Sequence, residues 1–262
     1  MKGVELYGRV RGRIEAILDW ATARGHRKGD NPARWRGHME NLLPKRAKVK
    51  RVQHHPALPY AEIGAFMADL RKQEGLAALA LELLILTATR TSEAIAARWD
   101  EIDLKAKVWT IPADRIKAGR EHRIPLSAPA VAILKSLLDA REKMPDGEPC
   151  PWVFPGVRGK SLSNGAILSL LKRMKRADIT AHGFRSTFRD WAAEQTAFPR
   201  DVAEMALAHA IGDKVEAAYR RGDLFEKRKR LMDAWAGYTA IGPAKGGKVL
   251  PLQHKSRAWS PT

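Results

Sequence analysis

The stretch LAALALELLILTATR, residues 76–90, decides the fold. Its residues are apolar nearly all round, and Glu82 is the one charged interruption before Arg90. A helix with apolar residues on every face is buried, because it has no polar side to present to water. The run is also too short to cross a bilayer. We therefore expect a helical protein whose core is built around this segment.

Helical spacing continues on both sides of this segment. Residues 60–75 place their apolar side chains on one helical face, and Gly75 is expected to close that helix. Thr91 or Ser92 is expected to cap a following helix that runs through Trp99. Further helices are expected at about 128–142, 163–176, 182–195, 199–209 and 224–237.

Two short runs between these helices have the composition of β-strands. KVWTIP (residues 107–112) and EHRIPLS (residues 121–127) are separated by the basic stretch ADRIKAGR. We expect the two runs to pair as antiparallel strands joined by a basic turn. The predicted fold class is therefore mainly α with a small antiparallel β-sheet, an α+β fold.

The N-terminal part differs from the rest in charge. A helix is expected from Val10 to about Gly25, followed by a short helix and a basic linker that ends near Pro59. Residues 1–51 hold 14 Lys and Arg against 5 acids, which is half of the formal net charge of +18. We expect three parts: residues 1–55, residues 56–240 and a basic tail at residues 241–262.

The net charge indicates a polyanionic partner. Lys and Arg total 47 and Asp and Glu total 29, and basic side chains that contact phosphates release condensed counterions. Ribosomal proteins and some membrane-surface proteins are similarly basic, so charge alone leaves those classes open. Cys150 is the only cysteine, which excludes an intrachain disulfide and a multi-cysteine zinc site. The N-terminus also lacks the apolar core of a secretory signal, so we expect a cytoplasmic protein that does not associate with membranes. We expect no metal and no cofactor.

Five places in the sequence could carry chemistry, and each also has an ordinary explanation. Arg90 could neutralise the end of a helix, and Lys117 could be a solvated turn residue. In HGFR, residues 182–185, the histidine could cap a helix. His209 could be a satisfied core histidine, and Tyr219 could be a half-buried packing residue. Taken one at a time, none of them establishes a function.

Their order along the chain changes this interpretation. Five stretches resemble, in the same order, the sequence boxes of the tyrosine recombinase (phage integrase) family: LLILTATRTSEAIAARWDEIDL (83–104), IPADRIKAGREHRIPLS (111–127), HGFRSTFRDWAAE (182–194), MALAH (205–209) and AAYRRGDL (217–224). The resemblance covers roughly residues 58–238 and is greatest to integrases of prophages and genomic islands. Ala88, Ser92 and Ala208 stand where that family usually has glycine, and they are also small.

The resemblance implies a set of site residues and a domain organisation. It assigns catalytic roles to Arg90, Lys117, His182, Arg185, His209 and the nucleophile Tyr219, with Glu93 in a supporting role. It also implies that residues 1–55 are the C-terminal part of a DNA-clamping domain with a basic linker, and that residues 56–240 are the catalytic domain. The first half of the clamp and an arm-site-binding domain would be missing, so we expect a truncated chain or a remnant.

The partners implied by the resemblance are double-stranded DNA attachment sites and further copies of the chain. We expect a monomer in solution, a tetramer on DNA, and accessory DNA-bending proteins as additional partners. The apolar side chains of the last helix could pack within the chain or on a neighbouring subunit. The residues expected to contact DNA are Arg9, Arg11, Arg13, Lys45, Arg46, Lys48, Lys50, Arg51, Arg123 and Arg189.

The chemistry of DNA cleavage explains why these residue types are needed. Attack at phosphorus adds negative charge to the non-bridging oxygens, and two arginine forks can hold one phosphate. A free phenol has a pKa of about 10, so Tyr219 needs a base, for which His182 is expected. Lys117 would protonate the departing 5′-oxygen, a contribution typically worth about 10²–10⁴ in rate. Arg115, Arg120 and Arg123 share the hairpin and are alternatives to Lys117.

Three other functions remain open on the sequence. A DNA-binding remnant without catalysis would keep the charge and the fold. A type IB topoisomerase uses similar residues but would relax plasmid without site preference. An RNA-binding or ribosomal accessory protein would explain the charge but not the five boxes.

Overall fold

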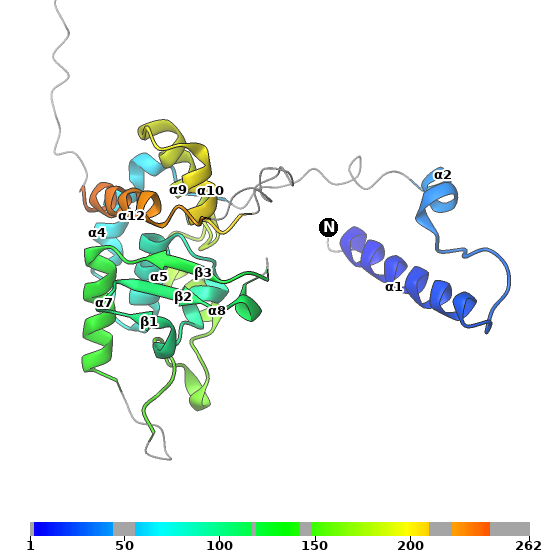
Figure 1. The fold of residues 1–262 in the computed structure, drawn as a ribbon, viewed down its shortest axis with the longest axis horizontal. Helices are drawn as coiled ribbons and strands as arrows, with labels where there is room; N and C mark the ends of the chain where they lie inside the picture. Colours follow the sequence, from blue (N-terminus) through cyan, green and yellow to red (C-terminus); the bar gives the residue numbers. More distant parts are fainter. Residues whose placement is uncertain (1–2, 44–55, 117–118, 142–147, 210–221, 242–262) are drawn as a thin grey trace, which may run out of the picture. The chain divides into compact units, whose positions relative to one another are not determined.

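The structure, a computed structural model, describes residues 3–43, 56–116, 119–141, 148–209 and 222–241 (Figure 1). The chain divides into two compact units, Met1–His54 and His55–Thr262, and each is described by itself. Within the described residues, no helix combines the length and the apolar character that crossing a membrane requires.

The N-terminal unit consists of one long helix and a short return segment. Its elements are α1 (Gly3–Ala23), the irregular turn η1 (Trp35–Met39) and α2 (Glu40–Leu42). The helix therefore begins earlier than the predicted Val10, and Gly25 follows it with a φ of +75°, a conformation that favours glycine. The Asn31 side-chain amide joins the return segment to α1 by donating to the Glu15 carbonyl oxygen at 2.8 Å.

This unit has little apolar core in its described part. Ala33 is its buried apolar residue. Five large apolar side chains of α1 are exposed instead: Tyr7, Val10, Ile14, Ile17 and Trp20. The described part of the unit is therefore held together mainly by polar contacts between α1 and the segment that returns along it.

The C-terminal unit is mainly helical with one small sheet. Its helices are α4 (Ile63–Leu70), α5 (Leu76–Thr87), α6 (Thr91–Ile95), α7 (Ala128–Asp139), α8 (Asn164–Arg173), α9 (Gly183–Gln195), α10 (Arg200–Ala206) and α12 (Phe225–Ala240). Its strands are β1 (Ile102–Asp103), β2 (Val108–Ile111) and β3 (His122–Pro125). Short 3₁₀ turns are η2 (Tyr60–Glu62), η3 (Trp99–Glu101), η4 (Ala113–Arg115) and η5 (Val157–Gly159).

The three strands form an antiparallel sheet in the order β1-β2-β3. The predicted pairing of the last two strands is confirmed, with Val108 opposite Pro125 and Ile111 opposite His122. The sequence analysis missed β1, because two residues are too few to show a strand's alternating pattern. Trp109 and Ile124 face each other in the register, and both are buried, so this face of the hairpin joins the core.

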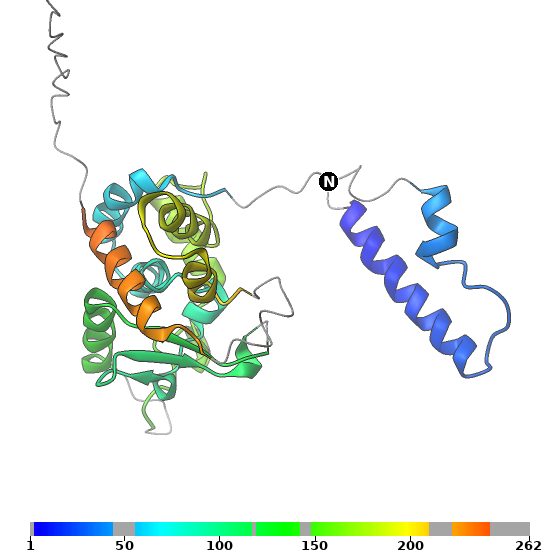
Figure 2. The same cartoon turned by 45° about the horizontal axis from the view of Figure 1, so that its top comes forward.

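Helix α5 is the centre of the core, as its sequence predicts. Figures 1 and 2 show it between the sheet and the α9–α10 pair. Leu81, Leu83 and Leu84 are fully buried, and each such side chain contributes roughly 1.5–3 kcal/mol through removal of apolar surface from water. Helices α6, α7, α8, α9 and α12 all pack against α5, so the helices that follow Arg90 and carry Arg185, α6 and α9, share one support.

The boundaries of two helices differ from the prediction. Helix α4 ends at Leu70, and Gly75, with a φ of +93°, begins α5 instead of closing α4. The N-cap residue of α6 is Arg90 and not Thr91 or Ser92. Glu93, at the third position of the helix, holds this start in place, because its carboxylate accepts the Arg90 backbone N–H at 2.8 Å.

Helix α6 also ends at Ile95 and does not continue to Trp99. The backbone after it is used for pairing with a distant segment. The Ala97 carbonyl oxygen accepts the Val153 N–H at 2.9 Å, and the Trp99 N–H donates to the Pro151 carbonyl oxygen at 3.0 Å. These bonds take the place of the helical bonds that a longer α6 would make.

Helix α12 packs its apolar face inside the same chain. Figure 2 shows it next to α4 and α7, which it contacts. Trp235 is fully buried, and its indole N–H donates to the Ile85 carbonyl oxygen of α5 at 2.8 Å. Its ring lies 5.5 Å from that of Phe188 and 4.9 Å from that of Trp191. Of the two packing alternatives for this helix, the structure therefore has the intramolecular one for Leu231, Met232 and Trp235.

Candidate active site

Arg90 lies where the central helix stops. Helix α5 ends at Thr87. The next residue, Ala88, has a left-handed conformation with a φ of +51°, which a small residue tolerates. The chain then turns so that Arg90 begins α6 with one fifth of its side chain exposed. Its guanidinium donates to Glu93 Oε1 at 2.7 Å. The buried Glu93 therefore holds both the backbone and the side chain of Arg90 in place.

Arg185 enters the same region from α9. It is 5% exposed, and its two terminal nitrogens each donate at 2.5 Å, one to the Ala88 and one to the Leu207 carbonyl oxygen. Burial, followed by the positive charge of Arg90, lowers the pKa of Arg185 to about 10. The guanidinium therefore remains protonated at neutral pH.

His209 contacts Arg185, and the residue before it contacts Arg90. Its Nε2 lies 3.2 Å from a terminal nitrogen of Arg185. The Ala208 carbonyl oxygen, one residue earlier, accepts from Arg90 at 3.3 Å. The other ring nitrogen of His209, Nδ1, lies 2.6 Å from Glu204 Oε2. Three of the predicted site residues, at positions 90, 185 and 209, are thus brought together from distant parts of the sequence.

His182 stands at the start of α9, three residues before Arg185, and its side chain is exposed. The position of this helix end is fixed by a close approach. A Cβ on Gly183 would lie 2.2 Å from the Pro56 carbonyl oxygen, so a side chain cannot be accommodated there without movement. The Thr187 hydroxyl also donates to the Leu58 carbonyl oxygen at 2.6 Å. The segment at residues 56–58 therefore anchors the helix that carries His182 and Arg185.

Two of the predicted catalytic residues, Lys117 and Tyr219, lie outside the described residues. The same holds for five predicted DNA contacts: Lys45, Arg46, Lys48, Lys50 and Arg51.

A buried arginine fixes the chain shortly after Tyr219. Arg228 on α12 is 1% exposed. It donates to the Asp223 carbonyl oxygen at 2.7 Å, to Asp223 Oδ2 at 2.7 Å and to the Arg123 carbonyl oxygen of β3 at 2.6 Å. Burial lowers its pKa, and the Asp223 carboxylate opposes that shift. Sequence reasoning missed this residue, although it lies three, four and seven positions before the buried Leu231, Met232 and Trp235.

His122 is a second residue that sequence reasoning missed. It lies in β3, two residues before the buried Ile124 and therefore on the same strand face. Burial, followed by the charge of Arg228, lowers its pKa to about 4. The imidazole is therefore neutral at physiological pH.

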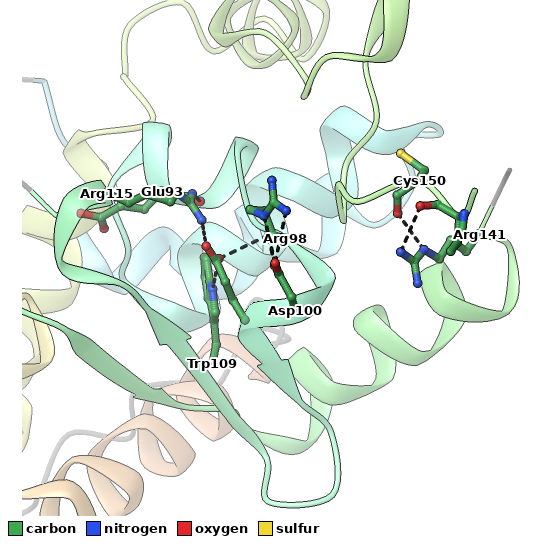
Figure 3. Close-up of polar contacts among 9 residues, drawn as sticks. Glu93, Arg98, Asp100, Trp109, Arg115, Arg141 and Cys150 are labelled. Atoms are coloured by element: carbon green, nitrogen blue, oxygen red, sulfur yellow. Dashed lines mark hydrogen bonds and ion pairs between the residues drawn. The ribbon is translucent and has the colours of Figure 1, made fainter. Parts of the chain in front are cut away.

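The hairpin is tied to the Arg90 region through Arg115. Its guanidinium donates to Glu101, which also accepts the Trp109 indole N–H at 3.0 Å (Figure 3). A second nitrogen donates to the Glu93 carbonyl oxygen at 3.2 Å. Arg115 therefore joins the loop between β2 and β3 to α6. It is a structural residue in the described conformation.

The arginines of α1 that are predicted to contact DNA differ in exposure and in their contacts within the chain. Arg9 and Arg13 of α1 are exposed. Arg11 is turned inward: it donates to Glu15 and to the Ala33 carbonyl oxygen, both at 2.6 Å, and its guanidinium lies over the Trp35 ring.

The two predicted contacts in the C-terminal unit are both paired with acids and half exposed. Arg123 lies 4.3 Å from the Phe225 ring centre and 3.6 Å from Asp223 Oδ2. The Arg189 Nε donates to Glu204 Oε1 at 2.7 Å. Both guanidiniums still reach solvent, so both are able to meet a phosphate.

A groove of about 670 Å³ lies elsewhere, beside the sheet. Arg98, Asp100 and Trp152 line it. Its two arginines are paired with acids: Arg115 with Glu101, and Arg98 with Asp100 through a 3.0 Å contact between Nε and Oδ1 (Figure 3). None of the predicted catalytic residues lies among its described lining residues. Among the residues that the structure describes, no group of three or more His, Cys, Asp or Glu is placed to hold a metal ion.

Comparison with known proteins identifies the family of this chain. The sequence profile of the phage integrase family matches residues 57–223, and that of the phage integrase central domain matches residues 2–38. Prophage integrase IntA of Escherichia coli strain K12 is 37% identical over 179 residues, which are 66% of this chain and 40% of that protein. The integrase of Enterobacteria phage P4 is 29% identical over 269 residues, which are 95% of this chain and 58% of that protein. The chain thus spans about half the length of these relatives.

Solved structures show the same fold at low sequence identity. A lambda integrase dimer bound to a COC′ core site has a TM-score of 0.53 and 18% identity, covering 81% of this chain and 73% of that one. The Tn1549 transposon integrase in complex with circular intermediate DNA has a TM-score of 0.53 and 16% identity, covering 82% of this chain and 78% of that one.

Proposed function

This chain belongs to the phage integrase family of tyrosine recombinases, and from that premise we propose that it cuts and rejoins double-stranded DNA at specific sites. Tyr219 is the proposed nucleophile, and the intermediate is a 3′-phosphotyrosyl link. One observation carries the proposal: Arg90 bonds to the Ala208 carbonyl oxygen and Arg185 contacts the neighbouring His209, although the three segments lie far apart in the sequence.

The two arginines suit a phosphate that gains charge during the reaction. A guanidinium has five N–H donors, and the described contacts of Arg90 and Arg185 take up only part of them. Donors already fixed in place stabilise the developing charge without reorganising during the reaction. Because Arg185 is buried, its attraction for that charge is screened less than it would be in water. Glu93 supports this site by fixing Arg90.

The proposed bond changes balance without an external energy source. The Tyr219 oxygen bonds to phosphorus, and the bond from phosphorus to the 5′-oxygen breaks. His182 accepts the phenol proton, and Lys117 gives a proton to the departing 5′-oxygen. In the second step a 5′-hydroxyl attacks the phosphotyrosyl bond, the phenol is restored, and the DNA is sealed.

The basic surface supplies the proposed binding to DNA. The predicted contacts are Arg9, Arg11, Arg13, Lys45, Arg46, Lys48, Lys50, Arg51, Arg123 and Arg189. Phosphate contacts of this kind fix orientation on the duplex but do not read sequence. We further propose that the protein acts in the cytoplasm, is a monomer in solution and assembles as a tetramer on paired sites, with accessory DNA-bending proteins as partners.

A covalent trap tests the proposal and identifies the cleavage site in the same experiment. A library of duplexes with a randomised core and a nick on one strand is incubated with the protein. A nick next to the cleavage position releases a short fragment, so resealing is prevented and the protein remains attached. Denaturation in detergent, recovery of protein-bound DNA and sequencing identify the site, and peptide mapping identifies the attached residue.

We expect an adduct on Tyr219 that disappears in Tyr219→Phe and persists in the matched control Tyr238→Phe, whose ring belongs to the aromatic cluster of α12. Binding of DNA by the wild-type protein without any adduct would contradict cleavage and leave a DNA-binding protein. Relaxation of supercoiled plasmid with no enriched sequence would instead indicate a topoisomerase.

A further inference from the structure

Glu204 makes contacts that the proposed chemistry does not yet use. It lies on α10, five residues before His209, and its side chain is 16% exposed. Its two carboxylate oxygens are divided between two partners. Oε2 lies 2.6 Å from His209 Nδ1, and Oε1 accepts from the Arg189 Nε at 2.7 Å. Glu204 therefore links the histidine of the site to the helix that carries Arg185.

The contact with Glu204 determines which nitrogen of His209 carries a proton. An ionised carboxylate only accepts hydrogen bonds, so the hydrogen between the two groups belongs to Nδ1. The opposite nitrogen, Nε2, then faces the terminal nitrogen of Arg185 at 3.2 Å. In the neutral ring Nε2 has a lone pair and accepts from Arg185. The ring is thus held with Nε2 toward Arg185 and Nδ1 toward Glu204.

The charge of Glu204 is well supported by its surroundings. Burial acts to raise its pKa, but hydrogen bonds from His209 and Arg189 outweigh burial, and the net shift is downward. Arg200 adds a second cation, with its Nε 3.8 Å from Oε1. The carboxylate is therefore ionised at neutral pH.

We propose that Glu204 is a positioning residue for DNA cleavage, whose ionised carboxylate orients His209 and favours the charged ring that donates from Nε2 to the scissile phosphate. The inference rests on the proposed function, because it requires a phosphate between Arg90 and Arg185. When that phosphate arrives, its oxygens replace Nε2 as acceptors for the Arg185 donors. A carboxylate on Nδ1 stabilises the imidazolium form, which has a hydrogen on each nitrogen.

A merely structural role for Glu204 would give different results. In that case the carboxylate would serve only to join α9 and α10 through Arg189, and its loss would lower stability with no specific effect on the histidine. Glu204→Gln separates the two roles, because it keeps the size of the side chain and removes the charge. Arg200→Ala is the matched control: it removes a cation near Glu204 and leaves the contact with His209 intact.

The first measurement is the single-turnover rate of adduct formation on the trapped DNA, followed from pH 6 to pH 8. We expect Glu204→Gln to slow the reaction by about 10- to 100-fold at pH 8, by analogy with the loss of a carboxylate that orients a histidine ligand in a metal site. The defect should shrink toward pH 6, because protons in solution then supply the charged ring that the carboxylate no longer favours. Glu204→Asp should recover part of the rate, and Arg200→Ala should stay within about twofold of wild type.

The second measurement does not depend on activity. Long-range ¹H–¹⁵N NMR spectra of the full chain report which ring nitrogen of His209 is protonated, with His209→Gln used for assignment. We expect the Nδ1–H form in the wild-type protein and a mixture of the two forms in Glu204→Gln.

The outcomes distinguish this inference from the function on which it rests. If the wild-type protein forms no adduct, the proposed function fails, and the NMR result still decides the orientation of His209. If the wild-type protein forms the adduct and Glu204→Gln is equally fast, or is slowed equally at every pH, the positioning role is wrong. An Nε2–H form in the wild-type protein would also overturn it.

Discussion

The buried guanidinium of Arg228 should be one of the largest single contributors to the stability of the C-terminal unit. The perturbation is Arg228→Met, which keeps an unbranched apolar stem and removes the charged end. In the folded protein this end donates three hydrogen bonds, two to the carbonyl oxygens of Asp223 and Arg123 and one to the Asp223 carboxylate. The substitution therefore removes the donors and leaves their acceptors behind.

The magnitude follows from those acceptors. A buried carbonyl that loses its partner costs about 1–3 kcal/mol, and breaking a buried ion pair costs about 3–5 kcal/mol. Asp223 is 43% exposed, so water can replace part of what its carboxylate loses. Removing the guanidinium also removes the cost of burying it, which is the reason its pKa is lowered. We therefore expect the free energy of unfolding to fall by about 2–4 kcal/mol.

Urea denaturation followed by tryptophan fluorescence measures this change, since Trp235 lies on α12 and Trp191 packs against it in the core. The control is Arg230→Met, two residues along the same helix at an exposed position, which should change stability by less than about 0.5 kcal/mol. A loss below about 1 kcal/mol for Arg228→Met, with an unchanged denaturant dependence, would show that the three hydrogen bonds contribute little net stability.

Two further predictions concern close packing and pH. Gly183→Ala should lower the free energy of unfolding by about 1–3 kcal/mol, because its Cβ would lie 2.2 Å from the Pro56 carbonyl oxygen; Gly237→Ala, which meets open space in α12, should be neutral or slightly stabilising in the same denaturation assay. His122 has a pKa of about 4 in the folded protein, below its ordinary value of 6.5. Between pH 4 and pH 6.5 the imidazole is therefore protonated in the unfolded chain and neutral in the folded one. The free energy of unfolding should rise with pH across this range. His122→Gln should reduce this rise, which for one group is at most about 1.4 kcal/mol per pH unit, and an identical slope for both proteins would show that the imidazole is not kept neutral by folding.

The parts of the fold that the sequence predicted are those with local patterns. Helix α5 was recognisable because its residues are apolar on all sides, and the hairpin because two short β-like runs flank a basic turn. The end of α6 was not, since it depends on backbone pairing with residues 151–153, which no local pattern reports. Strand β1 was missed because two residues carry no periodicity.

The candidate site shows the same division. The resemblance to a family brought out Arg90, Arg185 and His209, and the structure places these three together. It gave no indication that Arg185 is held by main-chain carbonyl oxygens, because any residue supplies a carbonyl. Arg228 could have been found from the helical period of α12, where a charged residue falls on the buried face. Glu204 carries no such signal, since acids on helices are common and its partner lies beyond the helix end.

The two acceptors of Arg185 have a consequence for how this protein can tolerate a buried cation. Ala88 and Leu207 follow the last residues of α5 and α10, so their carbonyls belong to the partially negative ends of two helix dipoles. Together these partial negative charges stabilise the positive charge of the guanidinium. No carboxylate is among the side chains that the structure shows bonded to Arg185. An incoming anion therefore does not have to displace an acidic side chain from Arg185 before it binds. Two main-chain carbonyl groups and one neutral ring nitrogen thus hold a positive charge in the interior of the fold, and that charge stays available to whatever anion enters.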